Sequence, residues 1–597
     1  MNQFVLMLSV GPVQGFISAA RRSRDLWSGS WLLSEMAKAS AHYLYEHKAQ
    51  MVFPYITTQT APNLQAGSDF SVGNKIQVLV EAASIDEVRQ LAQAASNAAK
   101  ARFKEVANEA KDRLGNKALR ADMWDQQVDD YVEVQSAWAR IASLSEYKQT
   151  CDQVSAILAA RKATRDFKPA ALSAYDAAAM LPKSSLDGMR ETVIKEGDLS
   201  QTLRRQLGLN DSEQLDCAGV LKRLGGQDHA EQFTPVTRVA AHAWLAKLSA
   251  EQRQELCTAY EPLVGLELAT RVKGNKNCYQ DFPYDAQFVY RFRLEASAYK
   301  SNSEEQEALQ ALKNVLLPLW RAHGEPSSYG VLLLADGDRM GELLDKANDV
   351  NTHQTITAAL SDFAGSVAAT MREFNGHCIY AGGDDVLGFV PLHEAYDCAQ
   401  SLAQRFHQAL APVAKELHAT APTLSVGLAI SHINTPLGHV RQLAQQAERF
   451  AKGDHVEKAD LQRNALGITL AIRSGNTTHM RLRWDDQNAH QALQKWVEAY
   501  LHKTIPSRVA YDTREVYLRT DFHTMDPQDD LLEKIRRAEF KLMLMKARTN
   551  EGKVLAEDLI QALNERALKV GSLNDLATEL IIARWLAAKT QKDLGKV

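Results

Sequence analysis

The chain has 597 residues, of which 45% are hydrophobic and 24% are charged. These are ordinary values for a globular protein and exclude wholesale disorder. At about 100–200 residues per domain, the length predicts three to five domains. The formal net charge of −4 excludes a surface that binds nucleic acid throughout, so any such contact must be a local patch or one shared with partner subunits.

The first residues are apolar, but they predict a core strand and not a signal peptide. No basic region precedes them, and Arg21, Arg22 and Arg24 follow. No apolar run approaches about 18 residues, so we expect no membrane span. The six cysteines form no close C-x-x-C pair, which favours a reducing compartment and therefore the cytoplasm.

Two stretches of the chain show the same order of predicted elements. In the first, strands are expected at 4–10, 51–56, 75–82 and 131–139, with helices at 13–49 and 85–114. In the second, a strand at 330–336, a helix at 354–375, two strands within 377–392, a helix at 394–419 and a strand at 423–431 are expected. The order β-α-β-β-α-β is that of a ferredoxin-like unit.

These patterns predict an α+β fold of four units. Two ferredoxin-like units occupy 1–145 and 326–480. A mainly helical insert lies between them at 146–325, and a helical, charge-rich unit follows at 481–597.

The most informative motif is Gly382-Gly383-Asp384-Asp385, between two short apolar runs. Two glycines allow a tight turn with positive φ, but a turn does not need the second aspartate. Asp336 and Asp338 end the first strand of the same unit, and that strand lies beside the hairpin in a ferredoxin-like sheet. We therefore expect three or four carboxylates to crowd one spot.

Crowded carboxylates must take up protons or bind cations. Two charges about 4 Å apart repel by roughly 4 kcal/mol at an effective dielectric constant of about 20. Hard oxygen ligands favour Mg²⁺ or Mn²⁺. Two such ions suit nucleotidyl transfer, because one activates a ribose 3′-hydroxyl and the other stabilises the pyrophosphate leaving group. The alternative is a solvated acidic turn without chemistry.

Several segments resemble the large subunit of type III-B CRISPR (Cmr) complexes. They include LSVGPVQGFISAARRSRDLWSGSWLLS, ARKATRDF, PKSSLDG, GVLKRL, FTPVTRVA, LLLADGDRMGELL and IYAGGDDVLGFVP, and they run in order to about residue 475. In that family the ferredoxin-like units are called palm domains, and only the second carries the catalytic hairpin. The loop between Ile56 and Lys75 of the first unit, which has no paired carboxylates, fits that pattern.

The resemblance implies an enzyme that acts inside an RNA-guided antiviral complex. Family members bind two ATP molecules between their palms and join them 3′ to 5′ into cyclic oligoadenylates when the complex captures target RNA. The implied partners are other Cmr subunits, guide RNA and target RNA. Asp336, Asp384 and Asp385 are then metal-binding and catalytic residues, and Asp338 is a further candidate ligand.

Two features of the family are missing from this sequence. Many members begin with a His-Asp metal nuclease domain, but this chain contains no His-Asp dipeptide, so we expect no DNase activity from it. Many members also hold zinc through paired cysteines. Here Cys217, Cys257 and Cys278 stand singly, so we expect buried thiols and no zinc.

Other residues are candidates for contacts with nucleotide or RNA. We predict nucleotide contacts at Gly337, Gly382 and Gly383. Gly11 to Gln14 form a strand-to-helix turn that can receive a phosphate or can be a plain turn with Pro12 at the first helical position. Lys452 can meet a triphosphate or be a solvated surface lysine.

Three clusters of basic residues are also candidates for a local RNA-binding or nucleotide-binding patch. Arg21, Arg22 and Arg24 form one, and Arg161, Lys162, Arg165 and Lys168 form another. A third set, mixed with acidic residues, predicts an exposed or subunit-facing surface; it comprises Arg536, Arg537, Lys541, Lys546 and Arg548.

Two other functions remain possible from the sequence. A free-standing diguanylate-type cyclase would usually carry one palm behind a sensor, and this chain has two palms and no recognisable sensor. A non-catalytic scaffold that holds guide and target RNA would not need the set Asp336, Asp384 and Asp385.

Overall fold

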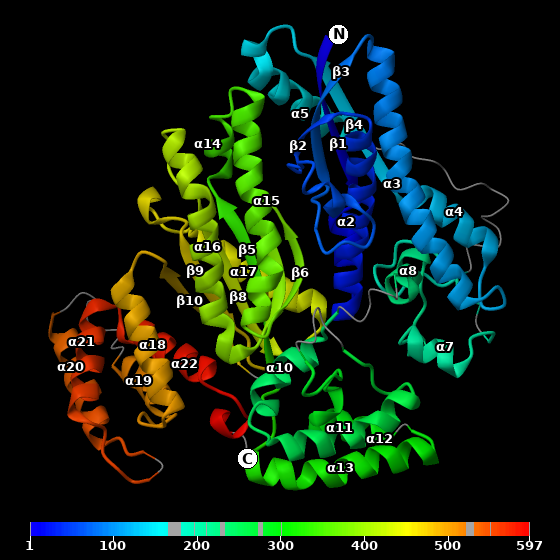
Figure 1. Cartoon of the computed structure of the whole chain (residues 1–597). Helices are drawn as coiled ribbons and strands as arrows, with labels where there is room; N and C mark the ends of the chain where they lie inside the picture. Colours follow the sequence, from blue (N-terminus) through cyan, green and yellow to red (C-terminus); the bar gives the residue numbers. More distant parts are fainter. Residues whose placement is uncertain are drawn as a thin grey trace.

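The first palm forms around an antiparallel sheet. The computed structural model describes residues 2–164, 181–195, 197–210, 212–226, 233–272, 279–299, 301–473, 475–520, 530–549 and 551–595. Within these residues the first sheet has the order β2-β3-β1-β4, as a ferredoxin-like unit requires. Helices α2 and α3 share the hydrophobic core on one face of this sheet (Figure 1). The elements are β1 (Asn2–Gly11), β2 (Gln50–Phe53), β3 (Lys75–Ala82), α3 (Ile85–Leu114), α4 (Ala121–Tyr131) and β4 (Glu133–Arg140).

The helix predicted over 13–49 is broken, so that prediction is wrong. Two helices take its place, α1 (Gln14–Ser18) and α2 (Ser23–Glu46). The backbone N–H groups of Arg21 and Arg22 each donate to Asp25 Oδ2 at 3.1 Å. A side chain that takes up orphan N–H groups starts a new helix, and hydrophobic periodicity does not reveal it.

The second palm contains the four predicted strands and two more. Among the described residues its sheet has the order β10-β9-β8-β5-β7-β6, in which β8, β5, β7 and β6 reproduce the ferredoxin-like order. The predicted α+β fold class is thus confirmed. The elements are β5 (Tyr329–Asp338), α14 (Met340–Leu344), α15 (Val350–Glu373), β6 (His377–Gly382), β7 (Asp385–Val390), α16 (Ala395–Glu416), β8 (Thr423–His432), α17 (Leu437–Lys452), β9 (Ala465–Leu470) and β10 (Thr478–Arg483).

Helix α17 lies unusually close to the sheet because β8 and β9 present glycines to it. A Cβ on Gly427 would lie 2.3 Å from Glu448 N, and one on Gly467 would lie 2.1 Å from Ala447 O. Strands β8 and β9 run parallel, so α17 is the crossover between them. This β-α-β extension places Lys452, the last residue of α17, beside the end of β5.

The predicted helical insert divides between two cores. Helices α7 (Gln201–Gln206) and α8 (Cys217–Leu224) lie beside the first palm, and residues of α8 belong to its core. Helices α10 (Val236–Leu245), α11 (Ala250–Gly265), α12 (Arg291–Ala298) and α13 (Ser303–His323) build a core of their own. Helix α5 (Tyr147–Ala163) covers the other face of the first sheet.

The C-terminal helices pack on the second palm and share its core. Figure 1 shows them gathered beside β10, with α22 returning toward the insert. The ring of Trp585 meets that of Tyr329 on β5 at a centroid distance of 4.5 Å. No helix in the described part of the chain could span a membrane. The helices are α18 (Gln487–Leu501), α19 (Val509–Arg519), α20 (Asp530–Lys546), α21 (Glu557–Lys569) and α22 (Leu573–Leu586).

The two palms touch directly through α15 and the edge strand β2. Gln354 Nε2 donates to Met51 O at 2.7 Å, and Thr357 Oγ1 donates to Val52 O at 2.6 Å. Side chains of the second palm therefore bond some of the backbone carbonyl groups that β2 would otherwise expose at the edge of the sheet.

Candidate active site

The second palm brings the predicted aspartates together at one end of its sheet. Strand β5 pairs with β7, and the last paired residues are Ala335 and Val386, so Asp336 lies next to Asp385 at the hairpin. A Cβ on Gly337 would lie 2.7 Å from Asp384 Cβ. The expected proximity of Asp336 to the Gly-Gly-Asp-Asp turn is therefore found. The roles of these residues in metal binding and catalysis stay predictions.

The crowding of these carboxylates contributes to raised pKa values for Asp384 and Asp385. Partial withdrawal from water, the contact with Asp336 and the charge of Asp384 together raise the pKa of Asp385 to about 8, although Asp385 stands at the exposed end of the hairpin. Burial and the charge of Asp336 likewise raise the pKa of Asp384. A site with this excess of negative charge favours a proton or a cation.

Lys452 supplies part of the missing positive charge. Its ammonium donates to Asp336 Oδ2 at 2.5 Å and lies 2.7 Å from Glu448 Oε1. These two bonds outweigh the effect of burial and raise the pKa of Lys452. The alternative of a solvated surface lysine is therefore wrong, and Lys452 belongs to the acidic cluster. A sequence pattern could not show this, because 116 residues separate it from Asp336.

The donor set suits a hard divalent cation, although it does not enclose one as it stands. Within the described residues, no three His, Cys, Asp or Glu side chains converge as a metal site. Carboxylates of Asp336, Asp384 and Asp385 are the ligand type that Mg²⁺ and Mn²⁺ prefer, and the raised pKa of Asp385 indicates uncompensated charge. The residues therefore fit such an ion, which would have to share Asp336 with Lys452.

Asp338 has a different environment from the other three aspartates. Its side chain is fully buried. It accepts hydrogen bonds from Ser425 Oγ at 2.8 Å, Thr423 Oγ1 at 2.8 Å and the backbone N–H of Asn464 at 3.0 Å. With its oxygens occupied, Asp338 ties β5 to β8 and to the start of β9. The prediction that it ligates metal is untested, and its contacts favour this structural role.

The glycines of the motif make room for the hairpin and its neighbours. Gly383 has φ of +84°, a conformation that other residues rarely adopt. Its Cβ position lies 3.8 Å from the ring of Phe53 in the first palm. Gly382 faces the hydroxyl of Tyr380. The hairpin tip thus meets the end of β2, and the acidic cluster lies at the junction of the two palms.

The turn from Gly11 to Gln14 offers less to a phosphate than its sequence suggests. Gly11 is the last residue of β1 and pairs with Glu133, and the peptide bond to Pro12 is cis. The helix begins only at Gln14 and has 5 residues. Pro12 is therefore not its first residue, so that alternative is wrong. A single short turn of helix carries little of the dipole that binds anions.

A cavity between the palms adjoins the hairpin, and sequence reasoning missed it. It has a volume of about 110 Å³ and lies between α2 and the loop before β3 on one side and α15 and β6 on the other. Tyr380 lines the cavity and also adjoins the acidic cluster, since the charges of Asp385 and Asp384 contribute to raising the pKa of its hydroxyl. The available signal was aromatic and basic residues repeated along α2. The lining includes Trp27, Trp31, Lys38, Phe70, Arg372 and Tyr380.

The remaining sequence candidates lie apart from the cluster. Cys217, Cys151 and Cys398 are buried in three different cores. Cys257 is only half-buried, so the expectation of a buried thiol is wrong there, and Cys278 is outside the described residues. Arg161 and Lys162 are exposed at the end of α5, whereas Arg165 and Lys168 lie outside the described residues.

One member of the C-terminal basic set does not fit the predicted exposed surface. Arg536 is only 6% exposed and stacks on the ring of Tyr517 at 4.7 Å. The prediction that Arg536 belongs to an exposed or subunit-facing surface is therefore wrong.

Known proteins resemble the chain over both palms. The family model for the second palm domain of Cas10/Cmr2 matches residues 329–466, and the model for the N-terminal part of the CRISPR-associated protein Cmr2 matches residues 5–116. The CRISPR system Cmr subunit Cmr2 of Pyrococcus furiosus is 24% identical over 208 residues, which is 30% of this chain and 23% of that protein. The alignment therefore spans about a quarter of this relative's length.

The fold is similar over almost the whole chain to that in two cryo-EM structures. One is a type III-B Cmr-beta complex in the apo state, with a TM-score of 0.62, 13% identity, and coverage of 98% of this chain and 81% of that one. The other is Cmr-beta bound to cognate target RNA, with a TM-score of 0.63, 13% identity, and coverage of 98% and 83%. Residues 329–466 therefore match the second palm domain of Cas10/Cmr2, residues 5–116 match the N-terminal part of Cmr2, and the chain shares the fold of the Cmr-beta chains over nearly its whole length.

Proposed function

We propose that the chain is the nucleotidyltransferase of an RNA-guided type III-B effector complex and condenses ATP, 3′ to 5′, into a cyclic oligoadenylate or a related AMP conjugate. The observation that carries this proposal is the meeting of Asp336 with Asp384 and Asp385 at a hairpin that touches the first palm. A solvated acidic turn would need neither a third carboxylate nor Lys452.

The chain's own residues have distinct tasks in this proposal. Asp336, Asp384 and Asp385 would hold one or two Mg²⁺ or Mn²⁺ ions, which when bound supply activation of the 3′-hydroxyl and neutralisation of the leaving pyrophosphate. Lys452 holds the carboxylate of Asp336 in place through its 2.5 Å bond. The hairpin, fixed by Gly383, keeps both adjacent carboxylates at the junction of the palms.

The inter-palm cavity is the proposed position of a nucleoside. Trp31, Phe70 and Tyr380 offer aromatic faces on which a base can stack, and Arg372 offers positive charge nearby, whereas the ammonium of Lys38 is already paired with Glu35. Its volume of about 110 Å³ is smaller than a whole nucleotide needs, so binding would require the palms to part slightly. A partner subunit or RNA that changes the separation of the palms would therefore control nucleotide binding.

The partners are proposed from the relatives. Solved Cmr-beta complexes, one bound to cognate target RNA, contain chains of the same fold. We therefore propose other Cmr subunits, a guide RNA and a target RNA as partners of this chain. The net charge of −4 agrees with RNA contacts that are shared among subunits.

The test is product formation by the assembled complex. ATP and Mg²⁺ are supplied with and without matching target RNA, and products are identified by mass spectrometry. Target-dependent product supports the proposal, and product from the isolated chain supports a free-standing cyclase. Absence of product with RNA binding retained supports a scaffold.

Paired variants locate the chemistry. Asp384→Ala with Asp385→Ala should abolish synthesis and leave assembly intact. The matched control is Asp129→Ala with Asp130→Ala, an adjacent acidic pair whose members form exposed ion pairs with Lys104 and Arg190. Retained synthesis in the hairpin variant would overturn the site assignment.

A separate variant tests the cavity. Phe70→Ala should raise the KM for ATP because it removes one aromatic face, while kcat should change little. Tyr299→Ala, at a residue that is 90% exposed, is the control. An unchanged KM in Phe70→Ala would remove the cavity from the proposal.

A further inference from the structure

Helix α8 of the insert presents two buried cations to the first palm. The residue Lys222 is 0% exposed, Arg223 is 3% exposed, and Asp25, the partner of Arg223, is 0% exposed. Charges this deeply buried persist only when they are paired and hydrogen-bonded. Each of the three is bonded at the corner between α1 and α2, defined here as residues 16–27.

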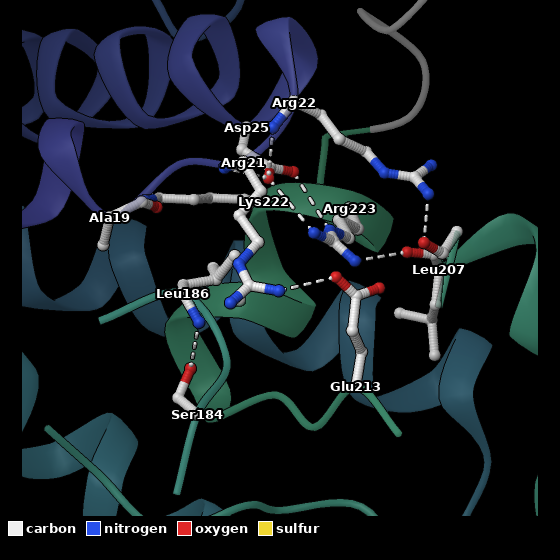
Figure 2. Close-up of polar contacts among 12 residues, drawn as sticks. Ala19, Arg21, Arg22, Asp25, Ser184, Leu186, Leu207, Glu213, Lys222 and Arg223 are labelled. Atoms are coloured by element: carbon white, nitrogen blue, oxygen red, sulfur yellow. Dashed lines mark hydrogen bonds and ion pairs between the residues drawn. The ribbon is translucent and has the colours of Figure 1, made fainter. Parts of the chain in front are cut away.

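Figure 2 shows how α8 holds this corner. Arg223 Nε donates to Asp25 Oδ1 at 3.0 Å and its second nitrogen donates to Oδ2 at 3.2 Å. The Asp25 carboxylate also accepts from the backbone N–H groups that begin α2. The ammonium of Lys222 donates to Phe16 O and Ala19 O, each at 2.5 Å, so it satisfies carbonyls where α1 ends.

The surroundings keep the pair of Arg223 and Asp25 in its charged form. The charge of Arg223 and its hydrogen bonds outweigh burial and hold the pKa of Asp25 below its usual value, so the pair is ionised at neutral pH. A third bond of Arg223 reaches Leu207 O at 2.8 Å. Gly29 leaves space for the lysine, since a Cβ there would lie 3.2 Å from Lys222 Cε.

The same corner supports the strand that leads into the acidic hairpin. Trp27, which is 8% exposed, belongs to one buried core with Phe233 of the insert and Ile379 of β6. Ring centroids of Trp27 and Phe233 are 5.7 Å apart, and those of Phe233 and His377 are 5.3 Å apart. Strand β6 runs from His377 to Gly382, where the hairpin begins. A shift of the corner therefore moves the packing beneath β6.

We infer that Asp25, Lys222 and Arg223 are positioning residues of the active site, through which the helical insert sets where the hairpin stands against the first palm. This inference rests on the proposed function. It goes beyond it because it assigns to α8 a control over catalysis from outside both palms. The physical basis is a series of packed side chains that runs from α2 through Trp27 and Phe233 to His377 of β6.

The test uses the assembled complex with Asp25→Asn and Arg223→Met combined. Asparagine can still accept from the N–H groups at the start of α2, and removal of both charges leaves neither member of the Asp25–Arg223 pair buried without its partner, while Lys222 keeps its two carbonyl acceptors. We expect kcat to fall by about tenfold to a hundredfold, the loss caused by misplacement of about 1 Å, with the KM for ATP within about twofold of wild type. Phe233→Leu, which only loosens the contact with β6, should give a smaller loss of the same kind.

A second readout does not depend on activity. Hydrogen–deuterium exchange should increase over 377–382 in the double variant. The matched control is Glu579→Gln with Arg566→Met, a pair at 2.7 Å with 5% and 13% side-chain exposure in the C-terminal helices, which should leave kcat and exchange over 377–382 unchanged. Wild-type kcat and exchange in the double variant, or an equal loss in the control, would overturn the inference. Absence of product from the wild-type complex would instead refute the proposed function, while the exchange data would still decide the positioning role.

Discussion

Gly337 is the residue at which a single methyl group would test the geometry of the acidic cluster. In Gly337→Ala the new Cβ would lie 2.7 Å from Asp384 Cβ, 3.0 Å from Met340 Cγ and 3.0 Å from Phe406 Cζ. Carbon atoms in good contact are about 3.5–4.0 Å apart. Since three neighbours are crowded at once, β5 and the hairpin must separate by close to 1 Å.

Two consequences follow from that separation. Overpacking of this kind costs about 1–3 kcal/mol of stability, and a displacement near 1 Å at reacting groups costs up to about a hundredfold in rate. We therefore expect Gly337→Ala to assemble into the complex with a modestly lower melting temperature and to lose most of its synthesis. The assay is product formation at saturating ATP and Mg²⁺, beside a thermal unfolding curve.

The chain offers a matched control four residues later. Gly341 lies in α14, and no heavy atom of the described residues, apart from its own helix backbone, would come within 4 Å of a Cβ there. Gly341→Ala should keep full synthesis and gain up to about 1 kcal/mol of helix stability. Full synthesis by Gly337→Ala would show that Asp336 and Asp384 do not act at a shared site.

Three further predictions follow from other contacts. Gly467→Ala should lower the melting temperature more than Gly337→Ala does, because its Cβ would lie 2.1 Å from the backbone atom Ala447 O, which cannot move away alone; equal melting temperatures would contradict the close packing of α17. Lys452→Met should tighten Mn²⁺ binding by about threefold or more, because it removes an ammonium that competes with the ion for Asp336. Electron paramagnetic resonance without ATP measures this affinity, and weaker Mn²⁺ binding would show that Lys452 supports the ion. His353→Asn should reduce the loss of stability in acid. Burial and the charge of Lys75 lower the pKa of His353 to about 4. Between pH 6.5 and 4 the unfolded chain therefore binds one proton more than the folded chain, and the free energy of unfolding falls by about 2 kcal/mol from pH 6.5 to 5. Denaturant titrations of the complex at these two pH values should show a smaller loss of stability in the variant, and an identical loss would refute the assignment.

Local sequence signals were reliable where one element determines its own structure. Periodicity predicted α3 at its observed bounds, Ile85–Leu114, and the glycine pair predicted the turn between β6 and β7. Periodicity failed at the corner between α1 and α2, because the start of α2 is set by the Asp25 carboxylate, which accepts two backbone N–H groups, and not by an apolar pattern. Strands β9 and β10 were not predicted, because they follow the ferredoxin-like unit and are not part of its β-α-β-β-α-β order.

The amino-acid sequence alone determined the two palms, the acidic turn and the expectation that Asp336 lies beside it, because strand order in a ferredoxin-like sheet follows from the order of its elements. Three features required the tertiary structure: Lys452 joins the acidic cluster, hydrogen bonds occupy the carboxylate of Asp338, and Arg223 of α8 binds Asp25 at the corner between α1 and α2. These contacts join residues 87 to 198 positions apart. No local pattern encodes such pairs, because they depend on how separately formed elements pack and on which buried charges must then find a partner.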